Sequence, residues 1–139
     1  MKLLLPLECV VTGPPVSHQS HNRDRLKTWQ EKVRQAAQAI LPKGTDPLSE
    51  KGLLVIVYFY DSRPILLDND NLAKPIADAL AGTWFVNDSQ ITDTIIRRTD
   101  ITLSFDVRRV SVALHEALLQ GEQFVYIRLE QAPAHENLL

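Results

Sequence analysis

Residues 53–80 read LLVIVYFYDSRPILLDNDNLAKPIADAL, and this stretch decides the fold. Its first eight residues, Leu53 to Tyr60, are all apolar or aromatic. Their β-branched and aromatic content favours a strand covered on both faces over a helix. Residues 61–64 (DSRP) predict a turn. After the acidic run that follows, apolar residues recur at helical spacing and mark the inner face of a helix that ends near Gly82. These residues are Leu72, Ile76, Ala79 and Leu80.

The polar residues of this second segment should lie on the other flank of the helix. At 100° per residue from Leu72, Asn71, Lys74 and Asp78 fall opposite the apolar stripe. Pro75 interrupts the pattern, because proline lacks a backbone N–H and disfavours a helical conformation of the residue before it. We therefore expect the helix to start irregularly around Pro75.

The rest of the chain alternates between strand and helix patterns. Residues 3–11, 91–98 and 124–130 read as strands, and Pro6 suits an edge or the start of the first one. A helix is expected from the N-cap residue Asn22 to about residue 41, and a third over the apolar positions 107–118, closed by Gly121. The order β-α-β-α-β-α-β predicts an α/β chain of the α+β sandwich type, a small mixed β-sheet with helices packed on it. We expect one domain over residues 1–132 and a frayed tail over 133–139.

Composition sets the broad class of protein. The chain has 139 residues, 45% of them hydrophobic, which is enough for a core in one domain. The only cysteine, Cys9, lies in an apolar run and predicts a buried free thiol, which fits a reducing compartment. The apolar run at the start of the sequence is too short for a signal peptide. No apolar stretch reaches the eighteen residues that a membrane-spanning helix needs. We therefore expect a cytoplasmic protein without a membrane partner.

Charge is unevenly distributed along the sequence. The net charge of −2 argues against a general nucleic-acid binder. Basic residues nevertheless gather locally, and local patches set the field that a partner meets. Arg23, Arg25 and Lys27 lie where a loop enters a helix, and if the partner is a nucleic acid, we expect them to contact its phosphates without reading bases.

The segment with the most candidate functional residues is acidic. Asp68 and Asp70 are followed at helical spacing by Lys74 and Asp78, and then by Asp88. In an extended segment residues two apart point the same way, so Asp68 and Asp70 should face one side. Clustered carboxylates repel one another unless a cation lies between them. Oxygen ligands without nearby histidine or cysteine indicate Mg²⁺, with Mn²⁺ as an alternative, and a lysine beside such a metal is typical of phosphoryl transfer.

Simpler interpretations compete with a metal site. Asp and Asn are favoured at turns and helix N-caps, so residues 68–71 alone could be only a capping turn. An EF-hand would need glycine and a carboxylate where the chain has Ala73 and Ala79. A phosphatase with an aspartyl nucleophile would have a hydroxyl residue soon after Asp70, and a nucleotide-sugar transferase would need a larger domain.

Residues 67–80 (LDNDNLAKPIADAL), followed by residues 86–91 (VNDSQI), resemble the signature of the RusA family of Holliday-junction resolvases. Residues 13–17 (GPPVS), with the basic segment after them, also resemble the opening of that family. The resemblance extends from about Val10 to Arg98. The chain departs from the smallest members in its longer segment over residues 104–121.

This resemblance implies both an activity and the residues that perform it. Asp68, Asp70 and Asp88 match the metal-binding acidic residues of the family, and Lys74 matches its catalytic lysine, so Lys74 and Asp70 are the expected catalytic residues. Asn71 and Asp78 match supporting positions in the motif. Family members are Mg²⁺-dependent homodimers that nick two strands symmetrically at four-way DNA junctions. A non-catalytic junction-binding protein of a mobile element and a metal-dependent nucleotide phosphohydrolase remain alternatives.

The aromatic and imidazole side chains are predicted to be structural or incidental. Trp29 lies on the apolar stripe of the first helix and is expected in the core. Trp84 and Phe85 lie between the two acidic segments and could stack on an opened base, but burial is the favoured interpretation. His18 and His21 border the basic segment, and as lone histidines they are expected to be incidental.

Overall fold

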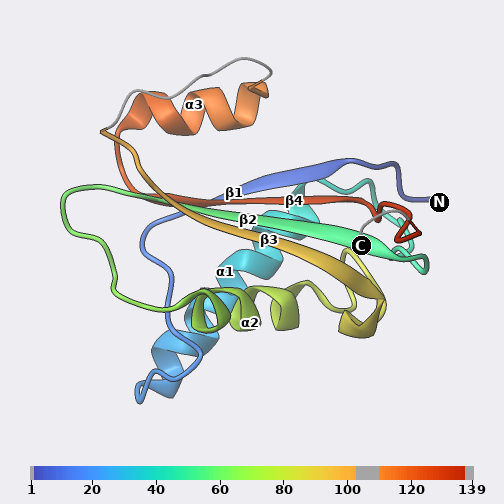
Figure 1. Cartoon of the computed structure of the whole chain (residues 1–139), viewed down its shortest axis with the longest axis horizontal. Coiled ribbons are helices and arrows are strands. Elements are labelled where there is room, and N and C mark those ends of the chain that lie inside the picture. The colour runs from blue at the N-terminus through green and yellow to red at the C-terminus, as the bar shows by residue number, and fades with distance from the viewer. Residues whose placement is uncertain (1, 103–109, 137–139) are drawn as a thin grey trace.

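The computed structural model describes residues 2–102 and 110–136, which form one mixed sheet with three helices (Figure 1). The predicted α+β class is therefore confirmed. The elements are, in chain order, β1 (Leu7–Thr12), α1 (Arg23–Ala39), β2 (Gly52–Tyr60), α2 (Asn69–Leu80), the 3₁₀ turn η1 (Asp88–Gln90), β3 (Ile91–Asp100), α3 (Val112–Gln120) and β4 (Phe124–Gln131). No helix of the described residues is both long and apolar enough to span a bilayer.

The sheet has the strand order β1-β4-β2-β3. β4 pairs antiparallel with both β1 and β2, whereas β2 and β3 are parallel. Helices α1 and α2 lie on one face of the sheet, and α3 lies on the opposite side near one end (Figure 1). The β2–β3 crossover therefore carries α2 along β3, which brings the acidic segments at residues 68–71 and 87–88 to the same side of the sheet.

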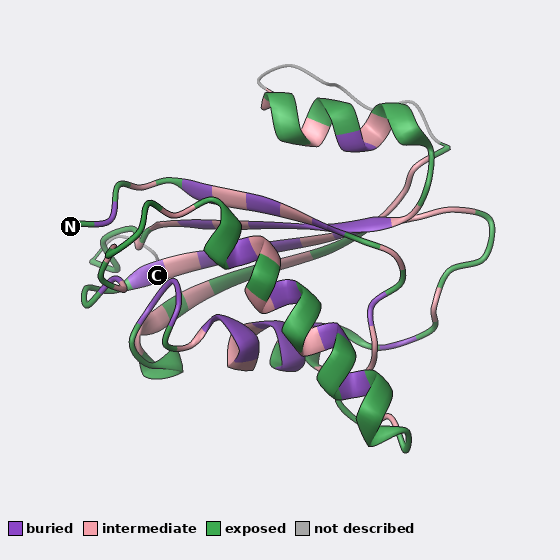
Figure 2. Cartoon of the chain, turned by 180° about the vertical axis from the view of Figure 1, so that it is seen from behind, coloured by how far each residue is buried: buried purple, intermediate pink, exposed green. Residues whose placement is uncertain are grey.

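The run of eight apolar residues lies in β2, where one face of the strand is buried and the other is only partly covered. Leu54, Ile56 and Tyr58 are fully buried under α1 and α2, as the sequence predicts for a central strand. On the other face, Val55 and Val57 are only half-buried, and cover comes from α3 near Phe59. The expectation of cover on both faces is wrong for most of the strand. Figure 2 agrees, because buried residues recur along the strands, α1 and α2 while α3 is mostly exposed.

Two tryptophans anchor the core between the helices and the sheet. Trp29 is buried on α1, as predicted. Trp84 has no exposed surface, and its indole Nε1 donates to the Ala37 carbonyl of α1 at 3.0 Å. Phe85 is equally buried. The favoured interpretation of residues 84–85 as core is confirmed, and neither ring can stack on a base without unfolding this region.

Cys9 is a buried free thiol, as its apolar surroundings predict. Burial, with a smaller contribution from the charge of Glu8, raises the pKa of the Cys9 thiol to about 12. The thiol therefore stays protonated and inert at physiological pH, because the thiolate is the reactive species.

Helix α2 differs from its prediction. It begins at Asn69 and runs through Pro75 without a break. Pro75 cannot donate to the carbonyl of Asn71, four residues earlier. That carbonyl instead accepts the backbone N–H of His18 at 3.0 Å. The irregular start expected around Pro75 is wrong because a segment distant in the sequence satisfies the freed carbonyl.

Two other element boundaries also differ. The first strand begins at Leu7, directly after Pro6, and not at residue 3. Helix α3 begins at Val112, where the Ser111 hydroxyl caps it by accepting the Leu114 N–H at 3.2 Å. The expected start near residue 107 lies outside the described residues. Gly121 ends α3 in the left-handed conformation, as predicted.

Candidate active site

The N-terminus of α2 holds the first acidic segment. Asp68 is the N-cap, and its Oδ1 accepts the backbone N–H of Asn71 at 2.8 Å. Asp70 lies in the first turn, where the positive end of the helix dipole favours a carboxylate. Because the helix already begins at Asn69, Asp68 and Asp70 are not in one extended segment. The expectation that both residues belong to one extended segment is therefore wrong.

The second acidic segment is held by a capping box. The Asn87 side chain accepts the Ser89 N–H at 2.9 Å, and Gln90 Oε1 accepts the Asn87 N–H at 2.8 Å. The Gln90 amide also donates to the carbonyls of Leu48 and Glu50, at 2.7 and 2.9 Å. This network fixes the turn that carries Asp88. Asn87 and Gln90 are thus structural residues that place the distant carboxylate.

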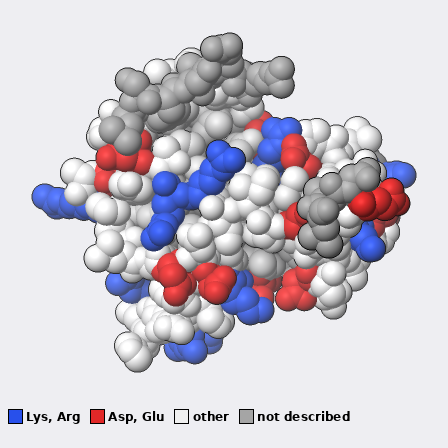
Figure 3. Space-filling model, in the orientation of Figure 1, with Lys and Arg blue, Asp and Glu red and all other residues white. Residues whose placement is uncertain are grey.

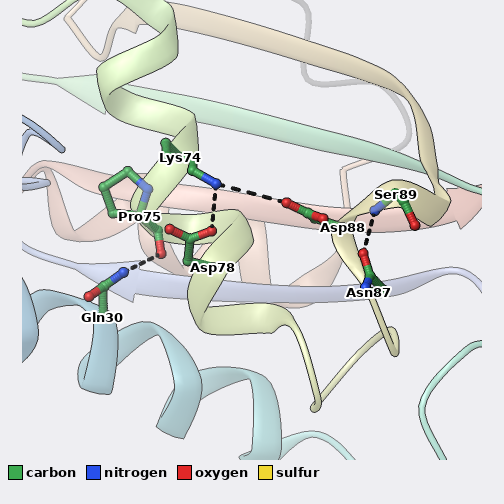
Figure 4. Close-up of polar contacts among 7 residues, drawn as sticks. All are labelled: Gln30, Lys74, Pro75, Asp78, Asn87, Asp88 and Ser89. Carbon is green, nitrogen blue, oxygen red and sulfur yellow. Dashed lines mark hydrogen bonds and ion pairs between the residues drawn. The ribbon is translucent and has the colours of Figure 1, made fainter.

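Lys74 lies between Asp78 of α2 and Asp88 of the second acidic segment (Figure 4). Its Nζ donates to Asp78 Oδ1 at 3.0 Å and lies 3.8 Å from Asp88 Oδ2. The hydrogen bond to Asp78, together with the charges of Asp78 and Asp88, raises the pKa of Lys74 above its usual value. The ammonium is therefore charged at neutral pH, which suits an electrostatic role and not that of a general base.

A cavity of about 500 Å³ opens between α2 and β3. The predicted residues Asp70, Asn71, Lys74 and Asp88 all line it. Asp68 and Asp78 are not among its lining residues. Asp78 contributes through its contact with Lys74, and Asp68 contributes the cap of α2. The structure thus brings four of the six expected residues of the acidic motif to one pocket. The other two are hydrogen-bonded to residues that line it, Asp78 to Lys74 and Asp68 to the backbone of Asn71.

The donor set of this pocket fits a hard divalent cation. Among the described residues, no three His, Cys, Asp or Glu side chains are gathered closely enough to enclose a metal on their own. Mg²⁺, however, is commonly held by one or two carboxylates and keeps waters and substrate phosphate oxygens as its other ligands. Asp70 and Asp88 supply two carboxylates to one pocket. The site fits a metal that is completed by the substrate.

His18 lines the pocket, although the sequence interpretation treated it as incidental. It lines the cavity beside Asp70 and Asn71. Its backbone N–H is bound to the Asn71 carbonyl, and its own carbonyl accepts Arg23 Nη1 at 3.2 Å. The imidazole is therefore brought to the site by backbone contacts. The available signal was Pro75, which leaves the Asn71 carbonyl without its helical donor.

The predicted DNA-binding residues lie on the first turns of α1. Arg23, Arg25 and Lys27 are all exposed. Arg25 also lines a second cavity of about 430 Å³, between α1 and the Gly13–Pro14 turn. On the face seen in Figure 3, basic and acidic side chains are both present, with no region of one sign covering the whole face. Basic character is therefore local, as the uneven charge distribution predicts.

Asp68 can be tested for its two roles separately. Its side chain caps α2 and could also contribute charge to a metal. Asp68→Asn keeps the capping oxygen, whereas Asp68→Ala removes it and should lower the free energy of unfolding by about 1 kcal/mol. If Asp68 also contributes charge to a metal, Asp68→Asn should lower nuclease activity while the thermal unfolding midpoint stays unchanged. Nuclease assays beside thermal melts of both variants separate the roles, and full activity in Asp68→Asn would leave only the cap.

Comparison with known proteins agrees with this geometry. The family described as Endodeoxyribonuclease RusA matches residues 12–114, a range that covers most of the chain and contains every residue of the pocket. No curated protein matches the chain. RusA nucleases depend on divalent metals in general, in keeping with the two carboxylates of the pocket. The chain belongs to the endodeoxyribonuclease RusA family.

Proposed function

We propose that this protein is a Mg²⁺-dependent endonuclease that resolves four-way DNA junctions by paired, symmetric nicks in recombination and repair. The observation that carries the proposal is the pocket shared by Asp70, Lys74 and Asp88 in a chain of this family. Mn²⁺ has the same preference for oxygen ligands and is expected to substitute.

The residues divide the chemistry between them. Asp70 and Asp88 would hold the metal, which when bound supplies charge to the phosphate and acidifies a water. Lys74 is kept charged by Asp78 and would stabilise the negative charge that develops on the phosphate or the leaving oxygen. Asp68 fixes the start of α2, and Asn71 presents its amide to the same pocket.

Arg23, Arg25 and Lys27 are proposed to position the DNA. They are exposed on α1. His18 connects this segment to α2, because its N–H donates to the Asn71 carbonyl and its carbonyl accepts the Arg23 guanidinium. Phosphate contacts of this kind set register and orientation without reading sequence. Their removal should weaken binding and reduce its dependence on salt concentration.

A three-substrate assay tests the function. A labelled four-way junction, its linear duplex arms and a nucleoside triphosphate are each incubated with protein, with and without Mg²⁺. Nicks at symmetric positions on opposed strands of the junction alone support the proposal. Binding without cleavage would indicate a junction-binding protein, and phosphate release from the nucleotide alone would indicate a phosphohydrolase.

The protein should form a homodimer. Symmetric nicking needs two active sites related by a two-fold axis, and the described residues hold one pocket with the acidic set. Val112 and Leu119 on α3 are about three-quarters exposed, and Ile95 on β3 is also exposed, which provides apolar surface for such a contact. Light scattering at micromolar concentration should give twice the 15.7 kDa chain mass. A monomer that still makes paired nicks would contradict this prediction.

A further inference from the structure

The acidic pocket is polar at its mouth and apolar in its depth. Its floor is formed by Leu54 of β2 and by Ile91 and Ile96 of β3. Its helical wall is formed by Ala73 and Ala77 of α2. These two alanines are four residues apart and therefore lie on one side of the helix. Because both side chains are small, the groove between α2 and the sheet stays open.

The position of β3 keeps this groove accessible. β3 is the last strand of the sheet that the described residues form, so no further strand flanks it. Thr94 and Ile96 line the groove from alternate positions of β3, on the sheet face that α2 covers. The groove therefore lies at the edge of the sheet, beside α2.

Three polar side chains of the pocket have no hydrogen-bond partner among the described residues. The amide of Asn71, the hydroxyl of Thr94 and the imidazole of His18 make no hydrogen bond to any part of the chain that the structure describes. Each of the three groups can take part in hydrogen bonds with a ligand. A metal and a phosphate need only the carboxylates and Lys74. The apolar floor and these three polar groups are left without a role in phosphate chemistry.

We propose that this pocket receives a single unstacked nucleobase of the DNA, next to the phosphate that is cut. The inference rests on the proposed nuclease function and adds a base-binding site to it. An apolar floor with a few polar groups at its rim is the usual construction of sites for flat, hydrogen-bonding ligands, and about 500 Å³ lies within their usual size of roughly 300–1,000 Å³.

The site would also give selectivity for branched DNA. Extruding a base costs stacking and pairing energy, and the cost is least where the base is already unpaired. A base beside a strand exchange is easier to extrude than one within a regular duplex. Trp84 and Phe85, the aromatic residues that the sequence offers for base contact, are fully buried. The pocket is therefore the place where a base can be accommodated beside the carboxylates.

Base extrusion can be observed directly without cleavage. Junctions carrying 2-aminopurine at each position that flanks the mapped nick are titrated with the Asp70→Asn variant, which is expected to bind without cutting. Fluorescence should rise at one position, because 2-aminopurine brightens on unstacking. No rise at any flanking position would overturn the proposal, even if the wild-type protein makes paired nicks. Absence of paired nicks by the wild-type protein would instead count against the proposed function.

A pocket-filling variant tests the location. Ala77→Leu places a larger side chain in the groove without changing a carboxylate, and it should lower junction cleavage about tenfold or more, the size of a lost base-stacking contact. Ala36→Leu is the matched control, because Ala36 is a half-buried helical alanine of α1 and does not line the pocket. Its cleavage should equal that of wild type, with thermal melts confirming that both variants fold.

An abasic nucleotide at the fluorescent position completes the experiment. Without a base to accommodate, the Ala77→Leu defect should disappear, and the variant should cut the abasic junction as fast as the wild-type protein does. A defect that persists on the abasic junction would show that Ala77→Leu acts by distorting α2 or by blocking a protein contact, and would overturn the proposed pocket.

Discussion

Junction cleavage should fall by on the order of 10³ when Asp70 is replaced by asparagine, while junction binding is kept or strengthened. Asp70 and Asp88 are the two carboxylates that line the pocket, so the substitution removes half of the negative charge available to a metal there. Asparagine has nearly the same shape, so the pocket is preserved. Removing one negative charge also reduces repulsion of the DNA phosphates.

The matched control is Asp24→Asn. Asp24 occupies the same place in the first turn of α1 that Asp70 occupies in α2, so both substitutions remove the same contact with a helix dipole. That contact is worth only about 0.3–1 kcal/mol of stability. Cleavage and junction binding are measured in Mg²⁺ for both variants. Near wild-type cleavage by Asp70→Asn would show that Asp70 holds no metal needed for the reaction.

The fold was predictable where burial follows a simple period. β2 has continuous apolar residues because it lies between two other strands under two helices, and α2 has an apolar stripe because one side faces the core. The cover of the second face was not predictable from β2 itself. Leu53 and Val55 look like fully buried residues in sequence, yet they are half-buried, because the cluster that includes α3 contains only Val57 and Phe59 from β2.

The candidate site was predictable in its residues more than in its geometry. The motif identifies Asp70, Lys74 and Asp88, and the parallel β2–β3 crossover places them at one pocket. Which of Asp68 and Asp70 caps α2 and which lines the pocket depends on where the helix starts. Helix boundaries predicted from sequence are uncertain by a few residues. Pro75 signals that the Asn71 carbonyl needs another donor, but that donor is a backbone N–H, so no residue type in the sequence identifies His18 as the partner.

Lys74→Ala should lower cleavage by on the order of 10²–10³, with a much smaller change in junction binding. Lys74 Nζ lies between Asp78 and Asp88, about half of its side chain is exposed (48%), and its raised pKa keeps it charged. A phosphate entering the pocket would meet this ammonium directly. Binding should change little, because one phosphate contact among many carries a small share of the affinity.

The competing interpretation is that Lys74 only forms a surface ion pair with Asp78. Such an i,i+4 pair is worth about 0.2–0.5 kcal/mol of stability and nothing to cleavage. Arg34→Ala provides the control, since Arg34 forms a comparable exposed pair with Glu31 at 2.6 Å on α1. It should cleave like wild type. Lys74→Arg keeps the charge but spreads it over a wider planar group, so rescue should be partial. Equal single-turnover cleavage by wild type and Lys74→Ala would remove Lys74 from the mechanism and leave Asp70 and Asp88 to be judged on their own.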